Sequence, residues 1–388
     1  MHKYSILLLF TLIHFNFSYG QVYNSSYAEI VNKCAYDSIY KNLQQFESYG
    51  VKEIGTSSLN NTKNWIINKY NHYGYTNIVE QPFSYFGYNT ENIIITKTGS
   101  VYPNKYIIID AHYDTRKGTG TNDNGSGTVI LFEIARLLKD INTEYSIKFI
   151  HFSGEEDGYI GSQYFINNTV IPQNLDIVLV FNIDEVGGVY GMTNNTIVCE
   201  RDEINPTANN AASAIVTNEL ANCVGLYSNL TAEISFAYLS DYIPFEANGE
   251  IITGFFEKNK STHPHTISDV FTNLDVNYVY EVSKAAIGAS LHFSKALKNV
   301  LNIDKNYSFN NIIAYPNPTN NEVSILLGET KTDVKIYLRN TIGQTILTKS
   351  YEAVDHIKIN IENQQPGLYF LILETKLGKS KNIKIIKK

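Results

Sequence analysis

The sequence has few cysteines and, after its first 20 residues, no long hydrophobic run. The three cysteines, Cys34, Cys199 and Cys223, cannot all pair within one chain, and none has the CxxC spacing of a cysteine zinc site. A Cys199–Cys223 disulfide is compatible with an oxidising compartment. No stretch beyond the first 20 residues reaches the ~20 apolar residues that a membrane helix needs. We therefore expect a mature chain without a transmembrane helix.

Signals of phosphate and nucleic-acid binding are also missing. The loop 118–127 is rich in glycine, but it has no Gly-Lys-Ser/Thr and no GxGxxG pattern leading into a helix. Basic residues are scarce in most of the chain. The net charge of −7 is the sum of +4 in residues 309–388 and −11 in residues 1–308. An acidic main domain argues against nucleic acid as a partner.

The patterns that are present divide the 388 residues into four segments. Residues 1–20 read as a secretory signal peptide, with a basic start, an apolar run and small residues before Gln21. Residues 21–300 form the predicted main domain, and residues 301–308 a linker. Residues 309–388 carry short strands at regular spacing, which are typical of a small all-β sandwich. The signal peptide predicts a secreted protein.

The main domain alternates strand and helix patterns. Mostly apolar runs at 106–112, 146–152 and 176–183 are typical of buried strands. Strand patterns also occur at 78–86 and 92–98, and a short apolar piece at 251–256. Helical periodicity follows at 129–138, and a long helix is predicted at 276–297. This order predicts an α/β domain with a mostly parallel, twisted sheet flanked by helices. In such sheets ligands bind at the carboxyl ends of the strands.

Polar side chains follow three of the predicted strands. His112 and Asp114 end one strand, the neighbouring carboxylates Glu155 and Glu156 follow the next, and Asp184 follows the third. Because the carboxyl ends of parallel strands meet at one edge of a sheet, we expect these side chains to converge. Each motif alone is commonplace, since a His-x-Asp pair is usually structural and a Gly-Glu-Glu is usually a solvated helix start. Their order within one α/β unit is what indicates a site.

A pair of divalent metals needs oxygen and imidazole ligands from several segments, with one carboxylate shared. Two further residues complete such a set: Asp123 in the glycine-rich loop and His265 in a late polar loop. The predicted ligands are His112, Asp123, Glu156, Asp184 and His265. Glu155 is then free to act as general base, and Asp114 to accept the second ring N–H of His112.

These residues lie in five motifs that resemble, in order, those of the dizinc aminopeptidases, metallopeptidase family twenty-eight. The motifs are His112-Tyr-Asp-Thr, Asn122-Asp-Asn-Gly-Ser-Gly, Phe152-Ser-Gly-Glu-Glu-Asp-Gly-Tyr-Ile-Gly-Ser, Asn182-Ile-Asp-Glu-Val-Gly and His265-Thr-Ile-Ser-Asp. The resemblance covers about residues 90–295. It implies a zinc exopeptidase fold and two zinc ions per chain, bridged by Asp123, with His112 and Asp184 on different ions and with Glu156 and His265 completing the two sites. It also implies removal of N-terminal residues from peptides by a water that the two zincs activate, with Glu155 as the base.

The substrate pocket is less well defined by the sequence. Ser240-Asp241 resembles a further family motif near the substrate cleft. Family members often place a tyrosine before the last histidine ligand to polarise the scissile carbonyl, but that position is Pro264 here. Tyr238, Tyr242 and His263 are the candidates to replace it.

The last 80 residues resemble the type A sorting domain of the type IX secretion system. The resemblance rests on Ala314-Tyr-Pro-Asn-Pro-Thr, residues 334–344, Pro366-Gly-Leu-Tyr-Phe and the basic end 384–388. It implies contact with the type IX secretion machinery and export across an outer membrane. The expected location is therefore outside the cell or on its surface.

Three alternatives to an aminopeptidase stay open at this stage. One is a single-zinc acyltransferase similar to the glutaminyl cyclases, a group whose fold resembles that of the aminopeptidases. Another is a carboxypeptidase or dipeptidase on this fold. The third is a binding module without catalysis, against which the intact set of ligands argues.

Overall fold

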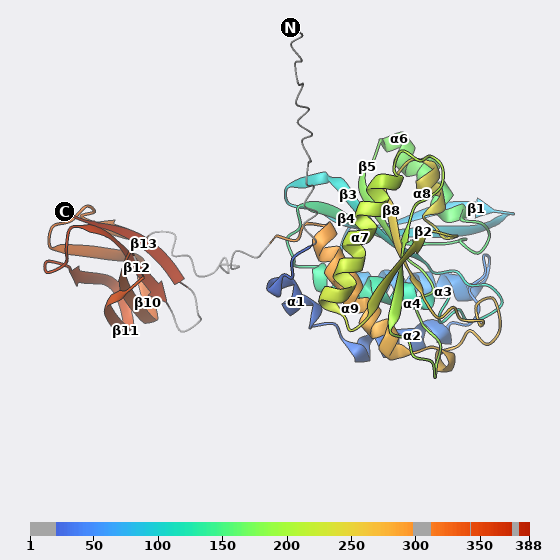
Figure 1. Ribbon diagram of the computed structural model, residues 1–388, viewed down its shortest axis with the longest axis horizontal. Coiled ribbons are helices and arrows are strands. Elements are labelled where there is room, and N and C mark those ends of the chain that lie inside the picture. The colour runs from blue at the N-terminus through green and yellow to red at the C-terminus, as the bar shows by residue number, and fades with distance from the viewer. Residues whose placement is uncertain (1–20, 298–311, 342, 375–379) are drawn as a thin grey trace, which may run out of the picture. The chain divides into compact units, whose positions relative to one another are not determined.

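The computed structural model describes residues 21–297, 312–341, 343–374 and 380–388 (Figure 1). The chain divides into two compact units, Met1–Lys298 and Asn299–Lys388, and each is described by itself. The predicted signal peptide, residues 1–20, and the predicted linker, residues 301–308, lie outside the described residues. Within the described residues no helix is long and apolar enough to cross a membrane.

The helices of the first unit lie where apolar residues recur at helical spacing. Their bounds are α1 Ser25–Val31, α2 Tyr36–Ser48, α3 Ser57–His72, α4 Gly125–Leu138, α5 Ile160–Phe165, α6 Ile171–Gln173, α7 Asn210–Tyr227, α8 Ile243–Ala247 and α9 Val276–Phe293. A π-helical turn, Ile166–Val170, joins α5 to α6, and a 3-10 turn, Phe271–Asn273, precedes α9. The long predicted helix at 276–297 thus ends four residues early, at Phe293.

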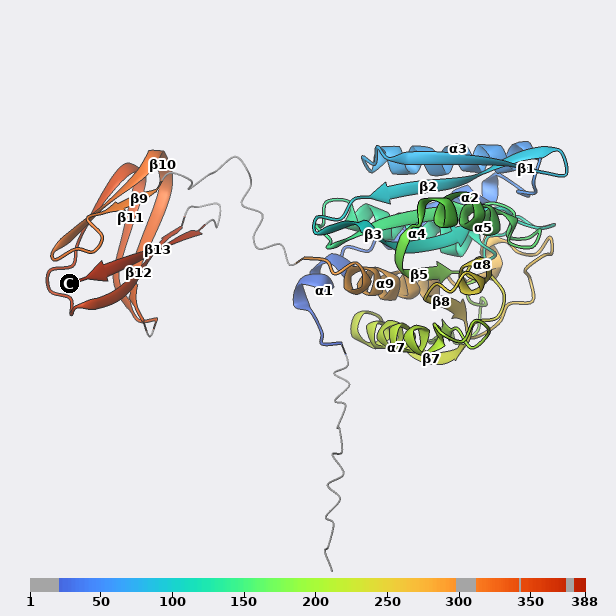
Figure 2. The same ribbon diagram turned by 90° about the horizontal axis from the view of Figure 1, so that it is seen from above.

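One eight-stranded sheet organises the unit, in the order β1-β2-β4-β3-β5-β8-β6-β7. Figure 2 shows this order from β1 at the top to β7 at the bottom. Four of its seven strand pairings are parallel. The strands are β1 Ile78–Tyr85, β2 Tyr88–Lys97, β3 Tyr102–His112, β4 Tyr145–Phe152, β5 Asp176–Ile183, β6 Thr196–Arg201, β7 Thr231–Phe236 and β8 Ile252–Glu257. The predicted α/β architecture is confirmed, but β6 and β7 are missing from the sequence-based prediction.

The central strands are mostly apolar because both of their faces are covered. Successive side chains of a strand point to opposite faces. Ile107 and Ile109 of β3 join the core under α1–α4, α7 and α9, whereas Ile108 joins the core under α5 and α8. All three isoleucines are fully buried. The sheet is therefore rigid where β3, β4 and β5 end, and polar groups placed there are held in fixed positions.

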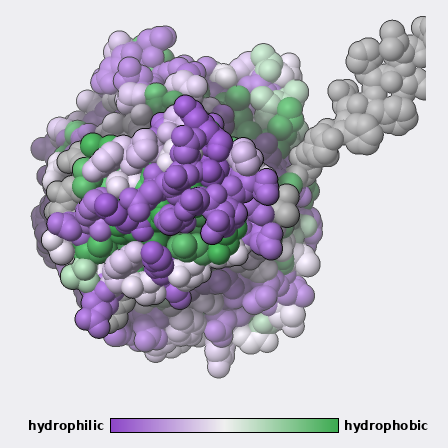
Figure 3. All heavy atoms as spheres, turned by 90° about the vertical axis from the view of Figure 1, so that its left-hand side faces the viewer, coloured by the Kyte–Doolittle hydropathy of each residue, from purple (hydrophilic) through white to green (hydrophobic). Residues whose placement is uncertain are grey.

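The second unit is an all-antiparallel sheet, in the order β11-β10-β12-β13, with β9 paired to β10. Its strands are β9 Ile313–Tyr315, β10 Glu322–Asn340, β11 Thr345–Asn360, β12 Gly367–Glu374 and β13 Ser380–Lys387. Alternate residues such as Val323, Ile325 and Ile336 fill its core. Figure 3 views this unit from the left-hand side of Figure 1, and hydrophilic side chains predominate on the face that it turns to the viewer. The sequence pattern predicts two short strands where the structure has β10, and two more where it has β11. Each pair is one long strand, because the backbone pairing of β10 with β11 resumes at Lys331 after a register shift.

All three cysteines are buried and free, so the disulfide considered between Cys199 and Cys223 is not formed. Burial raises the pKa of both thiols well above the ordinary value. They therefore pack as small apolar side chains in the core of the first unit.

Replacing Phe149 of β4 by alanine should lower the free energy of unfolding by about 3–5 kcal/mol, because the ring is fully buried and leaves a cavity. Phe86→Ala is the matched control, since that ring is 85% exposed and should change stability by about 0.5 kcal/mol or less. Urea denaturation followed by the fluorescence of Trp65 measures both. Equal losses in the two variants would contradict the described core.

Candidate metal centre

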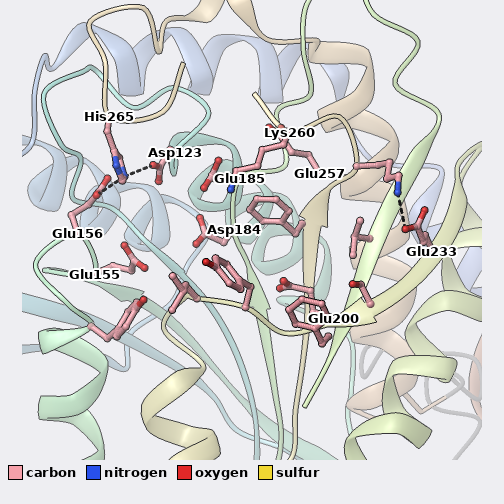
Figure 4. A pocket seen from close by; sticks show the side chains of 18 of the residues that line it. Asp123, Glu155, Glu156, Asp184, Glu185, Glu200, Glu233, Glu257, Lys260 and His265 are labelled. Carbon is pink, nitrogen blue, oxygen red and sulfur yellow. Dashed lines mark hydrogen bonds and ion pairs between the residues drawn. The ribbon is translucent and has the colours of Figure 1, made fainter. Parts of the chain in front are cut away.

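Three neighbouring strands deliver the polar groups of the site. β4, β3 and β5 are adjacent in the sheet, and all three run parallel to one another. His112 is the last residue of β3, Glu155 and Glu156 follow β4, and Asp184 directly follows β5. The predicted convergence at the carboxyl edge of the sheet is therefore present in the structure, and Figure 4 shows these acids lining one cavity.

Asp123 lies between the two histidines. Its Oδ1 is 3.2 Å from Nε2 of His112, and its Oδ2 is 3.2 Å from Nε2 of His265. Asp184 Oδ1 lies 3.2 Å from the same His112 nitrogen, and Glu156 Oε2 lies 2.8 Å from the same His265 nitrogen. One carboxylate thus joins two clusters that come from five separate segments.

The potential ligand atoms form two groups of three. His112, Glu155 and Asp184 place one such atom each within 4.8 Å of the others, and Asp123, Glu156 and His265 do the same. Glu155, expected as a free base, is therefore a member of the first group, and His112 and Asp184 share this group instead of belonging to different metal sites. The Oε2 of Glu155 is 3.9 Å from His112 Nε2, farther than either aspartate.

Asp114 contacts His112 through its backbone carbonyl, whereas the sequence predicted a contact through its carboxylate. The Nδ1 of His112 lies 3.1 Å from the backbone carbonyl of Asp114 and 3.7 Å from its carboxylate. The carboxylate instead accepts the backbone N–H groups of Glu155 and Glu156, each at 3.3 Å. Gly154, with a φ of +80°, makes the turn that points these N–H groups at Asp114. Asp114 is thus beside His112 as predicted, but its carboxylate binds the backbone of the turn that carries Glu155 and Glu156.

The loop that carries Asp123 is fixed from two sides. Asp269 accepts the N–H of Asn122 at 2.8 Å and that of Asp123 at 3.1 Å. The side chain of Asn124 caps α4 by accepting the N–H of Gly127, and it donates to the carbonyl of Ile183 at 2.9 Å. Because Ile183 precedes Asp184, this bond sets the loop beside the end of β5. Asp269 belongs to the quoted histidine motif, but the sequence did not identify this role.

Burial and neighbouring charges shift the pKa of each acid. Burial raises the pKa of Glu155 well above its ordinary value, although His112 opposes this. Burial also raises the pKa of Glu156 to about 7, against the hydrogen bond from His265. Burial would raise the pKa of Asp123 too, but hydrogen bonds from His112 and His265 outweigh it and lower that pKa. Asp123 is thus the most firmly ionised of the three.

The two histidines are held protonated by these acids. Hydrogen bonds to Asp123 and Glu156 raise the pKa of His265 to about 10. For His112, burial opposes the charged form, but the nearby Asp184 and Glu155 outweigh it and raise its pKa.

The Ser240-Asp241 motif lies behind the site. Ser240 donates to Asp184 Oδ2 at 2.8 Å and so fixes that carboxylate. Asp241 is fully buried, and the side chain of Ser162 lies beside its carboxylate. Burial raises its pKa to about 7. Neither residue lines the cavity, so they support the site rather than contact a substrate there.

Of the three candidates to replace the tyrosine missing at Pro264, only Tyr238 lines the cavity. The hydroxyl of Tyr242 is buried, where it accepts the backbone N–H of Tyr238 and donates to Glu200. The ring of His263 is 3.0 Å from Ser268 and lies away from the cavity lining. Tyr242 and His263 are therefore not part of the cavity lining.

The cavity holds about 590 Å³ and extends well beyond the two clusters. Its lining also includes acids that the sequence did not single out, among them Glu185 and Glu200 (Figure 4). Apolar residues such as Phe256 line it as well. The signal for Glu185 was its place beside Asp184. Glu200 lies on β6, a strand that the sequence did not predict.

The donor set suits zinc. Two imidazoles and four carboxylates, with their potential ligand atoms in two compact groups, are ligands that zinc accepts, and the shared Asp123 suits a two-metal site. Glu156 Oε1 is buried without a partner in the described structure, as an unused ligand atom would be. Four buried or half-buried acids against two histidines also leave an excess of negative charge, which bound cations would neutralise.

Fold and donor set together define a protein similar to the zinc exopeptidases, and comparison with known families agrees. The model of peptidase family M28 matches residues 92–290, just over half of the chain. The chain belongs to this family. Residues 313–388 match the model of a secretion system C-terminal sorting domain.

Individual relatives match shorter stretches. Aminopeptidase YwaD of Bacillus subtilis is 36% identical over 100 residues, which are 25% of this chain and 22% of that protein. The chain spans less than two thirds of the length of such relatives.

Two solved structures show the same fold over most of their length. The LapA aminopeptidase of Legionella pneumophila has a TM-score of 0.63 at 19% identity, covering 76% of this chain and 81% of its own. The glutaminyl cyclase of Macrostomum lignano has a TM-score of 0.63 at 13% identity, covering 71% and 94%. At these identities the likeness is one of fold alone.

Zinc binding to the metal-free protein should release protons and tighten as the pH rises. In the metal-free protein His265 is protonated below its pKa of about 10, whereas zinc binds the neutral imidazole. Acid therefore competes with the metal. Calorimetric titrations with zinc in two buffers of different ionisation enthalpy count the released protons.

Loss of the His265 ring in His265→Ala should weaken zinc binding by at least the roughly 10–100-fold that outer partners of a metal site contribute. His263→Ala is the matched control, because that ring lies outside the cavity lining. Zinc binding without proton release, or equal effects of the two variants, would contradict the described centre.

Proposed function

We propose that this chain is a secreted zinc exopeptidase that removes N-terminal residues from peptides, with two zinc ions per chain. The observation that carries the proposal is the position of Asp123, whose two oxygens face His112 and His265. This is the arrangement in which one carboxylate can be shared between two metals. His112 with Asp184, and Glu156 with His265, would complete the two sites.

Two bound zinc ions would polarise the scissile carbonyl and lower the pKa of the attacking water. The rest of the chemistry belongs to the protein. Glu155 is 13% exposed and faces the cavity, so it can reach a water there. It takes the proton as the water oxygen bonds to the carbonyl carbon. It then gives that proton to the amide nitrogen, the C–N bond breaks, and the new amine leaves.

Asp114 acts through Glu155 and is a positioning residue. Its carboxylate accepts the backbone N–H groups of Glu155 and Glu156, while its carbonyl oxygen orients the ring of His112. Ser240 is a positioning residue too, because its hydroxyl donates a hydrogen bond to the carboxylate of Asp184. Tyr238, which lines the cavity, is the remaining candidate among the three to donate a hydrogen bond to the carbonyl oxygen.

The charge of the cavity favours an aminopeptidase over a carboxypeptidase. Beyond the proposed ligands, the lining includes Glu185, Glu200, Glu233 and Glu257, against Lys258 and Lys260. A lining with this excess of acid attracts the ammonium group of a peptide N-terminus and repels a terminal carboxylate.

A glutaminyl cyclase-like acyltransferase is the second candidate, because such an enzyme shares the fold. That class works with one zinc. The second donor group around His112 and Asp184 favours two metals and therefore hydrolysis. A peptide with N-terminal glutamine separates the two reactions, since hydrolysis releases free glutamine whereas cyclisation releases ammonia and leaves the peptide bond intact.

The sorting domain at residues 313–388 supports export, and we propose that it engages the type IX secretion machinery. The main unit would then act outside the cell or on its surface.

Glu155→Gln should retain both zinc ions and lose hydrolysis by about 10²–10⁴-fold, because the amide cannot carry the proton. Metal content by mass spectrometry and hydrolysis of an aminoacyl reporter measure the two effects separately. Asp157→Gln, an exposed acid in the same turn, is the control and should keep its rate. Near wild-type turnover in Glu155→Gln would rule out the base, and loss of one zinc would make Glu155 a ligand.

A further inference from the structure

The floor of the cavity is formed by three strands that the sequence pattern did not group together. β6 pairs with β8 in antiparallel register and with β7 in parallel register. Val198 pairs with Phe256 and Glu233, whereas Glu200 pairs with Gly254 and Ser235. Because alternate residues of a strand share a face, Val198 and Glu200 point to the same side, and both line the cavity. Glu200 is the one acid on β6 that lines it.

Glu200 is a deeply buried carboxylate with no cation beside it. Its residue is 5% exposed. Its carboxylate lies over Gly254, since a Cβ added there would stand 3.0 Å from Glu200 Oε2. The groups that donate hydrogen bonds to this carboxylate are neutral: the hydroxyl of Tyr242, at 3.4 Å, and the backbone of Tyr238. No ion pair in the described part of the chain includes it.

The other charges of this part of the cavity are already engaged. Glu233 pairs with Lys258 at 2.7 Å, and both side chains are nearly half exposed. The carboxylate of Glu257 accepts hydrogen bonds from Asn122, Gly188 and Ser261. Lys260 offsets part of the charge of Glu185. Glu257 also has no cation beside it, but its carboxylate accepts N–H groups from three residues at 2.6–3.2 Å, whereas the hydroxyl that faces Glu200 lies at 3.4 Å, so Glu200 is the less well satisfied acid of the floor.

The walls around this acid are apolar. Val198, Phe236, Leu239 and Phe256 are apolar residues of the cavity lining, and Tyr238 adds a ring. A pocket with apolar walls and an acidic floor fits a side chain with an aliphatic stem and a cationic tip. Lysine and arginine have this form, whereas leucine would leave the carboxylate buried and unpaired.

We propose that this pocket receives the side chain of the N-terminal residue and selects lysine or arginine, with Glu200 as the specificity-determining residue. The inference rests on the proposed exopeptidase function and adds the substrate class. Burial raises the pKa of Glu200 to about 8 in the described state, so a cation bound beside it would favour the ionised form.

The test uses the zinc-loaded, full-length protein and pairs of reporters that have similar shapes but differ in charge. Lysine is compared with norleucine, and arginine with citrulline, as aminoacyl reporters of one leaving group. The kcat/KM of each cationic residue should exceed that of its neutral counterpart by about tenfold or more, because the neutral residue leaves Glu200 without a partner. This comparison needs no variant and does not depend on the folding of one.

Glu200→Gln should then reduce the lysine-to-norleucine and arginine-to-citrulline ratios at least about tenfold. Glu233→Gln is the matched control and should change the ratios less, since that acid is exposed and already paired with Lys258. Thermal unfolding with zinc bound checks that both variants are folded.

The outcomes separate this inference from the proposed function. If the zinc-loaded protein cleaves leucine or norleucine reporters as well as lysine reporters, the exopeptidase stands and the cationic selectivity is wrong. Unchanged ratios in folded Glu200→Gln overturn the role of Glu200. If no aminoacyl reporter is cleaved, the proposed function fails, and the inference fails with it.

Discussion

The site depends on one constraint, the need to neutralise several carboxylates that the fold holds together away from water. Glu155 and Asp184 lie in one group with His112, and Asp123 and Glu156 lie in another with His265, at the edge of the sheet. In the metal-free state protons on His112 and His265 balance part of this charge, which is why the pKa of each histidine is raised. Asp123 is central because it faces both histidines at once. Bound cations would replace those protons.

The surrounding structure serves to keep these groups in place. The apolar strands β3, β4 and β5 are buried on both faces, so the residues that follow them have little freedom. Asp269 and Asn124 then fix the loop of Asp123 by hydrogen bonds to its backbone and to β5. Asp114 fixes the turn that carries the glutamates. Geometry that a metal would require is thus largely set by backbone contacts of the protein itself.

Much of the site could be predicted from the sequence, because its residues sit at the ends of strongly apolar strands. Position relative to β3, β4 and β5 was sufficient to bring His112, Glu155 and Asp184 together. The roles of single atoms could not be predicted. The sequence assigns Asp114 to His112, but only the folded turn shows that its carboxylate is taken by two N–H groups while its carbonyl meets the ring.

The part of the cavity formed by β6, β7 and β8 could not be predicted from the sequence, for a different reason. β7 is largely exposed and has no apolar run, and β6 mixes apolar residues with charged ones, so neither gives a strong strand signal. Glu200 and Gly254 become neighbours only through the register of β6 and β8, 54 positions apart in sequence. Likewise β10 was divided in two, because its polar middle resembles a turn although its backbone pairing resumes there.

The most direct test of the account is a crystal structure of the zinc-loaded protein with anomalous data collected at the zinc edge. The account predicts two zinc peaks roughly 3.5–4 Å apart, one bound by His112 and Asp184 and the other by Glu156 and His265. Asp123 should contact both ions, and Glu155 should contact neither. A single peak, or Glu155 in the coordination sphere of either ion, would contradict it.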